Sequence, residues 1–176
     1  MNTKKIGLVL LLTFLAFAGY CQDDVKEEIS TPDDYSHYLE TISDSVQYLK
    51  DAWANDLSKI NDSDHDYAKI RKSSNALLKF VKDKKHDVKN LGAIGKDGEV
   101  LKDSYTKYLN SEIESIIKCY VPFAEIKGSS SEADYNNLIN QLKQENEHEK
   151  ELAETLNAAR DVYENENNLS ADSGED

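Results

Sequence analysis

Residues 31–60 read TPDDYSHYLETISDSVQYLKDAWANDLSKI, and this stretch decides the fold. It opens with Thr31, a helix-capping residue, followed by Pro32 at the first helical position and by Asp33 and Asp34 in the first turn. Its apolar residues then recur in steps of three and four, the spacing of one face of an α-helix. The stretch therefore predicts a long amphipathic helix, whose apolar face comprises Tyr35, Leu39, Ile42, Val46, Leu49, Trp53, Leu57 and Ile60.

Three further segments repeat this spacing, over residues 66–91, 101–123 and 134–163. Pro122 interrupts the third of them, and we expect a kink or an early end there because proline removes a backbone hydrogen bond. Short polar links make sequential helices antiparallel neighbours, and four such helices can bury their apolar faces only together. We predict an all-α, antiparallel up-down-up-down four-helix bundle over residues 31–163.

Two segments outside this domain have little to bury. Residues 22–30 are predicted to be a flexible N-terminal segment, and residues 164–176 a disordered acidic tail of Asn, Glu, Ser and Asp.

The first 21 residues have the features of a secretory signal peptide. Lys4 and Lys5 precede an apolar run over residues 6–18, which is too short to cross a bilayer as a helix. Cleavage after Ala18, cleavage after Cys21 and lipidation of Cys21 are all compatible with the local sequence, and we favour cleavage near Cys21 without an anchor. We therefore expect a bacterial protein of the periplasm or the cell surface, with an outer-membrane lipid anchor and membrane contact only if Cys21 is acylated.

Charge and cysteine content exclude several classes of protein. Without residues 1–21 the chain has 19 Lys and Arg against 34 Asp and Glu, a net charge of −15. This disfavours nucleic acid and anionic membrane surfaces as partners, because both require a basic surface. With Cys21 removed or acylated, Cys119 is unpaired, so no disulfide framework supports the fold.

No catalytic motif or cofactor motif is present, so we predict a protein that is not an enzyme and has no cofactor. Each of the four histidines has an acidic residue three positions earlier, which is half of the pattern of bundle di-metal sites. Only Glu145, His148 and Glu149 approach an inward-facing position, and they are the candidate metal ligands. We favour solvated surface histidines over this metal site, because acidic neighbours are frequent in so acidic a chain.

Positive charge is concentrated in the second helical segment. Residues 66–91 carry eight Lys or Arg against three Asp, whereas residues 22–65 and 132–176 are acidic. Lys82, Lys84, Lys85 and Lys89 could present a basic strip to an anionic ligand. The favoured alternative is that this helix lies beside the acidic first helix and fixes the bundle arrangement through ion pairs at the rim.

The Tyr38–Trp53 stretch, the Tyr105–Glu125 helix and the Tyr135-x-x-Leu138 opening of the last helix resemble an uncharacterised family of short exported bacterial helical proteins, described as surface proteins or lipoproteins. The resemblance implies no catalytic residues. We predict a non-enzymatic helical bundle of the cell envelope that binds an unknown protein or small-molecule ligand, with a metal-binding bundle as the alternative.

Overall fold

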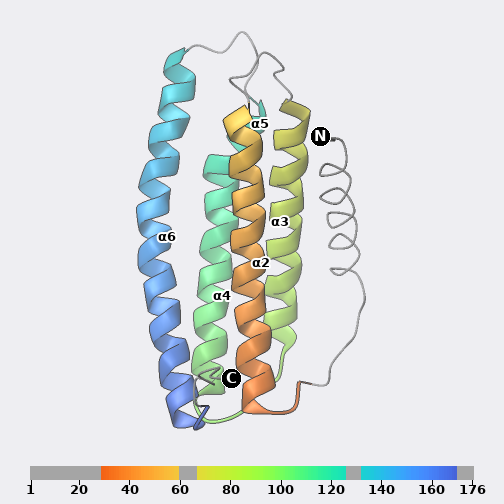
Figure 1. The fold of residues 1–176 in the computed structure, drawn as a ribbon, viewed down its shortest axis with the longest axis vertical. Helices are drawn as coiled ribbons and strands as arrows, with labels where there is room; N and C mark the ends of the chain where they lie inside the picture. Colours follow the sequence, from red (N-terminus) through yellow and green to blue (C-terminus); the bar gives the residue numbers. More distant parts are fainter. Residues whose placement is uncertain (1–28, 60–66, 126–131, 170–176) are drawn as a thin grey trace, which may run out of the picture.

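A computed structural model describes residues 29–59, 67–125 and 132–169. These residues are all-helical and contain no strand, which confirms the predicted fold class. The four long helices lie side by side (Figure 1), and two short helical segments, η2 and α5, continue α4. Their bounds are α2 (Pro32–Ser58), α3 (Tyr67–Asn90), α4 (Gly98–Ser115), η2 (Ile116–Tyr120), α5 (Val121–Glu125) and α6 (Glu132–Glu166).

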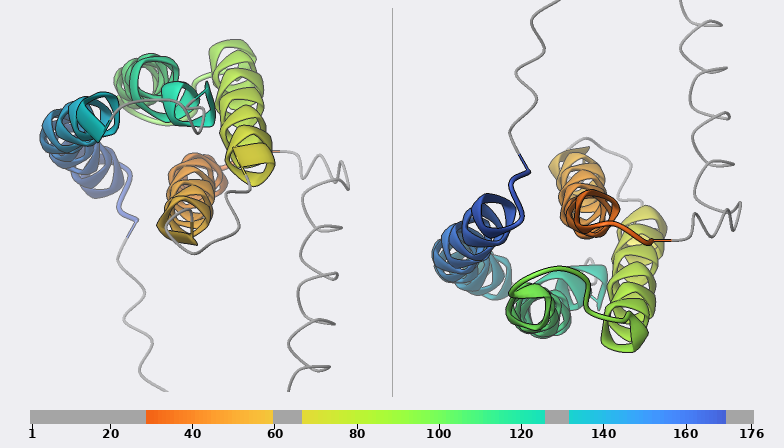
Figure 2. Two further views of the ribbon diagram at one scale, coloured as in Figure 1. Left: turned by 90° about the horizontal axis from the view of Figure 1, so that it is seen from above. Right: turned by 90° about the horizontal axis from the view of Figure 1, so that it is seen from below.

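The helices are neighbours in the order α2, α3, α4 and α6 around a shared core, as the end views in Figure 2 show. Contacts are extensive between consecutive members of this order and sparse between α2 and α6. The first and last helices are therefore joined mainly through side chains, such as the ion pair of Arg160 on α6 with Glu40 on α2. None of the helices in the described part of the chain is long and apolar enough to cross a membrane.

The start of α2 follows from the capping residues in its sequence. Thr31 Oγ1 accepts a 3.1 Å hydrogen bond from the Asp34 amide, and the Thr31 amide donates a 3.1 Å bond to the Asp34 carboxylate. This reciprocal capping box satisfies amides that have no partner within the helix. The hydrogen bonds from Thr31 also hold the pKa of Asp34 below its usual value. The face predicted to be apolar is the buried one, including Tyr35, Leu39 and Val46.

An aromatic cluster fills the end of the core where α2 finishes. The rings of Trp53 and Tyr120 lie 4.3 Å apart between centroids, and Phe123 packs edge-on against Trp53 at 5.5 Å. Trp53 is only 2% exposed, and its indole N–H donates a 2.8 Å hydrogen bond to Ser74 Oγ of α3. The large buried aromatic area stabilises this end, and the hydrogen bond satisfies the one polar group of the indole.

Asn167 and Tyr163 fasten the C-terminal end of α6 to the loop before α4. The Tyr163 hydroxyl donates a 2.8 Å hydrogen bond to the carbonyl of Ile94, and Asn167 exchanges two hydrogen bonds with the backbone of Lys96. Helix and specific contacts thus extend a few residues past position 164, where the disordered tail is predicted to begin, since α6 continues to Glu166 and Asn167 bonds Lys96.

The chain does not end its helix at Pro122, as the prediction allowed, and a π-helical turn precedes the proline instead. The five residues before Val121 form a π-helical turn, and the Val121 amide donates to the carbonyl of Ile116, five residues back. The chain then resumes as the short helix α5, which contains Pro122. A π-helical turn shifts the residues that follow around the helix axis, and such turns are frequent at functional sites.

Candidate ligand-binding site

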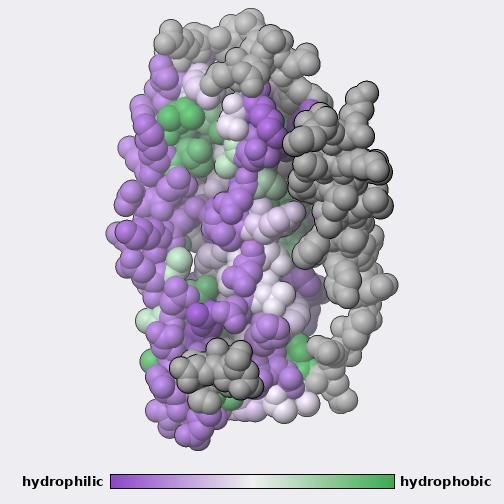
Figure 3. Space-filling model, in the orientation of Figure 1, coloured by the Kyte–Doolittle hydropathy of each residue, from purple (hydrophilic) through white to green (hydrophobic). Residues whose placement is uncertain are grey.

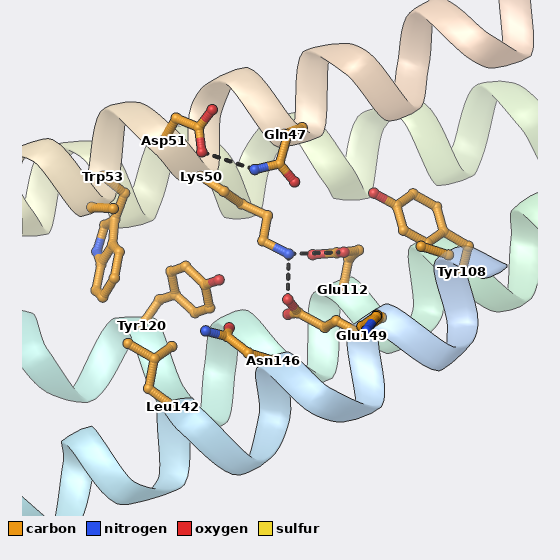
Figure 4. A pocket seen from close by; sticks show the side chains of 13 residues that line it. Gln47, Lys50, Asp51, Trp53, Tyr108, Glu112, Tyr120, Leu142, Asn146 and Glu149 are labelled. Carbon is orange, nitrogen blue, oxygen red and sulfur yellow. Dashed lines mark hydrogen bonds and ion pairs between the residues drawn. The ribbon is translucent and has the colours of Figure 1, made fainter.

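Three charged side chains from three helices meet inside the bundle (Figure 4). Lys50 of α2 is the central residue: its Nζ lies 3.2 Å from Glu112 Oε1 of α4 and also donates to Glu149 Oε2 of α6. Ser115, which is fully buried, donates a 2.5 Å hydrogen bond to the other oxygen of Glu149. These four residues are called the Lys50 cluster below.

The helical repeat explains why these polar side chains lie inside. Glu112 is three residues after the buried Leu109 and four before the buried Ile116, so it occupies the inward face of α4. Glu149 lies on the same face of α6 as Leu142, seven residues before it, and Leu156, seven residues after it. Both carboxylates therefore interrupt otherwise apolar faces, and burial of unpaired charge would be unfavourable without Lys50.

The three charged residues of the Lys50 cluster form part of the wall of a cavity of about 370 Å³, which is lined mainly by residues of α2 and α6. Pockets for small ligands typically measure ~300–1,000 Å³ and combine apolar walls with a few convergent polar groups. This cavity lies within that range of volume and is the more polar kind, since six of its thirteen lining residues are aromatic or aliphatic and seven are polar or charged. Its lining comprises Gln47, Lys50, Asp51, Trp53, Ala54, Tyr108, Glu112, Tyr120, Leu142, Asn146, Glu149, Lys150 and Ala153.

Apolar surface continues from the cavity along the first half of α6. The surface view in Figure 3 is mostly hydrophilic along α2 and α6, with hydrophobic residues showing beside the upper part of α6. Half-buried apolar side chains in this part of α6 are Leu138, Ile139 and Leu142, of which Leu142 lines the cavity.

The electrostatics of the site are set by burial. Glu112 is 2% exposed, and burial raises the pKa of its carboxyl, with the charge of Glu149 adding to the rise and Lys50 opposing it. Burial also raises the pKa of the Tyr108 and Tyr120 hydroxyls, and the nearby carboxylates add to that rise. Both phenols therefore stay neutral and keep a proton to donate.

The Lys50 cluster is incompletely paired. Two carboxylates share one ammonium group, and Glu112 Oε2 is a buried oxygen without a partner in good hydrogen-bond geometry, although the Tyr108 hydroxyl lies close enough to this carboxyl to oppose the rise in its pKa that burial causes. Buried oxygens without a partner are rare in folded proteins. One physical reason for such an oxygen is that it binds a ligand.

The structure separates the candidate metal ligands. Glu149 is buried in the Lys50 cluster, whereas His148 is exposed and Glu145 lies half-buried beside a second cavity with Cys119. Over residues 29–59, 67–125 and 132–169, no group of three or more His, Cys, Asp or Glu side chains is placed to hold a metal ion. The alternative of a metal site at Glu145, His148 and Glu149 stays a prediction.

The lysines of the predicted basic strip differ in their surroundings. Lys82 and Lys89 are exposed, while Lys84 and Lys85 are half-buried. Lys84 pairs with Asp87 at 3.2 Å, and its Nζ lies 5.8 Å from the centre of the Tyr38 ring of α2. These contacts place Lys84 at the packed boundary between α3 and α2, which suits a role in helix arrangement better than one in anion binding.

Comparisons with protein-family models, with curated proteins and with solved structures found no match. The resemblance to an exported helical family stays a prediction.

Proposed function

We propose that this chain is a non-enzymatic, exported binding module that holds a small-molecule ligand in the cavity between α2, α4, η2 and α6. The observation that carries the proposal is Glu112, a fully buried carboxylate that lines a cavity of ligand size and has one oxygen without a partner. A ligand with a hydrogen-bond donor would satisfy that oxygen, and the free energy gained would favour the bound state.

We further propose that the four helices form an antiparallel up-down-up-down bundle. Contacts between helix ends support this arrangement. Trp53 near the end of α2 contacts Ser74 in the first half of α3, and Tyr35 at the start of α2 bonds the carbonyl of Gly98 at the start of α4. Tyr163 at the end of α6 also donates a 3.3 Å bond to the carbonyl of Pro32.

The proposed location is the periplasm or the cell surface. The basic and apolar pattern of residues 1–21 supports export, and this segment and Cys21 lie outside the described residues.

Native mass spectrometry of the chain purified from its host, compared with the mass after denaturation, tests both proposals. We expect a bound molecule that is lost on denaturation and a polypeptide mass that shows removal of the first 18–21 residues. The control is Ala153→Phe, because Ala153 lines the cavity and a phenyl group there would fill it. This variant should carry no bound molecule. Wild-type protein without a bound molecule would contradict the binding function, and an uncleaved N-terminus would contradict export.

A further inference from the structure

The charges of the Lys50 cluster specify what kind of ligand would complete it. Glu112 and Glu149 together require two positive partners, and Lys50 supplies one. Asp51 and Lys150, which also line the cavity, have opposite charges, so the lining carries one excess negative charge when Glu112 and Glu149 are both ionised. Burying such an unpaired charge is unfavourable, and a positively charged group in the cavity would neutralise it.

We infer that the cavity binds an organic ammonium ion, that is, an amine carried on a small apolar or aromatic body. This inference rests on the proposed binding function and adds the chemical class of the ligand. The ammonium group of the ligand would donate to the free Glu112 Oε2, or it would replace Lys50 as the partner of Glu112. In both cases the ligand would pair with Glu112 and Lys50 with Glu149. Charge-assisted hydrogen bonds of this kind are stronger than neutral ones.

A metal ion fits this cavity less well than an ammonium ion. Calcium takes six to eight oxygen ligands, and magnesium needs a regular octahedron. Here the Lys50 ammonium already lies between the two carboxylates, and a single carboxylate oxygen has no partner. An anion would be repelled by the excess negative charge of the lining.

The rest of the lining suits the apolar part of such a ligand. Trp53, Tyr108 and Tyr120 provide aromatic surface, and Leu142 and Ala153 of α6 provide aliphatic surface. Aromatic rings also attract cations through their π-electrons, which adds to the selectivity for a positively charged ligand.

Three probes of similar size separate charge from shape: 2-phenylethylamine, 2-phenylethanol and phenylacetate, each titrated into the full chain by isothermal calorimetry. Trp53 is the single tryptophan of the chain and lines the cavity, so its fluorescence provides a second readout. We expect 2-phenylethylamine to bind at least about tenfold more tightly than 2-phenylethanol, and phenylacetate not to bind. Calcium chloride, titrated separately, should produce no binding heat.

The variant that tests the mechanism is Glu112→Gln, which keeps the shape of the side chain and removes its charge. It should weaken binding of 2-phenylethylamine at least about tenfold. Glu149→Gln should also weaken binding, and it carries the test if Glu112→Gln does not fold by circular dichroism. The matched control is Glu114→Gln, an exposed carboxylate on the same helix that pairs with Lys118 and should leave affinity unchanged.

Equal binding of the amine and the alcohol, unchanged affinity in both Gln variants, or no binding of the amine would each overturn the ammonium inference. The first two outcomes would leave the proposed binding function intact, because the cavity would still take a ligand. That function fails separately, if the host protein carries no bound molecule.

Discussion

Lys50 Nζ lies 3.2 Å from Glu112 Oε1, and the two side chains are only 12% and 3% exposed. Because the same ammonium group also bonds Glu149, one lysine joins α2 to both α4 and α6 at a single level of the bundle. A buried ion pair adds little net stability compared with apolar packing, but removal of one partner leaves charge without compensation. This asymmetry gives distinct expectations for single and combined substitutions.

Lys50→Met should strongly destabilise the protein, since it leaves two buried carboxylates without a cation. We expect the free energy of unfolding to fall by about 3 kcal/mol or more, measured by urea denaturation. The control is Lys79→Met, which removes an exposed pair with Asp83 and should change stability by less than about 0.5 kcal/mol. Equal effects of the two substitutions would show that Lys50 does not compensate buried charge.

Replacing the whole Lys50 cluster by apolar residues should restore stability. The combined variant Lys50→Met, Glu112→Met, Ser115→Ala and Glu149→Leu removes every charge together with the hydroxyl that bonds Glu149. We expect an unfolding free energy equal to that of the wild type or higher, because no charge remains to be desolvated. The same variant should lose binding of 2-phenylethylamine. If it is as unstable as Lys50→Met, the cluster is required for folding, and not for ligand binding alone.

The pH dependence of stability should reveal the titration of Glu112. Burial raises the pKa of this carboxyl above its usual value of 4.5, so above that pH the folded state holds a proton that the unfolded chain has lost. The free energy of unfolding therefore falls as pH rises from 4.5 toward the folded-state pKa. The charged and titratable groups that act on Glu112 are Lys50 from α2, Glu149 from α6 and Tyr108 on its own helix.

Glu112→Gln lacks this titration, so its stability relative to the wild type should increase with pH above 4.5. Urea denaturation of both proteins at several pH values between 4.5 and 8 measures the difference, with Glu114→Gln as the exposed control. Parallel stability curves for the wild type and Glu112→Gln would contradict a raised pKa for Glu112.

The parts of the fold that depend on local sequence could be predicted. The start of α2 is determined by Thr31 and Asp34, which are three residues apart, and its buried face by a spacing visible in the sequence. The end of α6 could not be predicted in this way, because Asn167 acts through the backbone of Lys96, 71 residues earlier. The polar composition beyond residue 163 predicts a disordered tail, whereas the long-range contact between Asn167 and Lys96 fastens the chain just after α6.

The candidate site shows the same limit. The sequence pattern predicts Glu149 as a polar residue on an apolar face, but it does not lead to Lys50 or Glu112. Glu112 carried a usable signal, since it is spaced three residues after Leu109 and four before Ile116. Lys50 carried none, because it follows the apolar Leu49 and meets its partners 62 and 99 residues away. Periodicity shows which face of a helix is buried, and the relative heights of neighbouring helices depend on tertiary packing.

Ser74→Ala should destabilise the aromatic end of the bundle. Ser74 and Trp53 are both almost fully buried, and the substitution removes the acceptor of the indole N–H while leaving that donor without water. We expect a loss of about 1–3 kcal/mol in the free energy of unfolding. Ser73→Ala is the neighbouring control, because the Ser73 hydroxyl bonds only its own helix backbone and should matter little. Similar losses in both variants would show that the bond to Trp53 has no special role.

Gly95→Ala should destabilise the loop that Asn167 fastens to α6. Gly95 has a φ of +74°, a conformation that costs residues with a Cβ about 1–2 kcal/mol, and a Cβ there would lie 2.5 Å from Asn167 Oδ1. The side chain of Asn167 would have to move, and its hydrogen bonds to Lys96 would weaken. We therefore expect a loss of at least about 1 kcal/mol in the free energy of unfolding, together with faster hydrogen exchange of the Lys96 amide.

Gly92→Ala in the same loop is the control, because a Cβ there meets no atom within 4 Å. It should be neutral or slightly stabilising, since alanine restricts the unfolded chain. Equal stabilities of the two variants would show that the contact between Asn167 and the loop does not hold the end of α6.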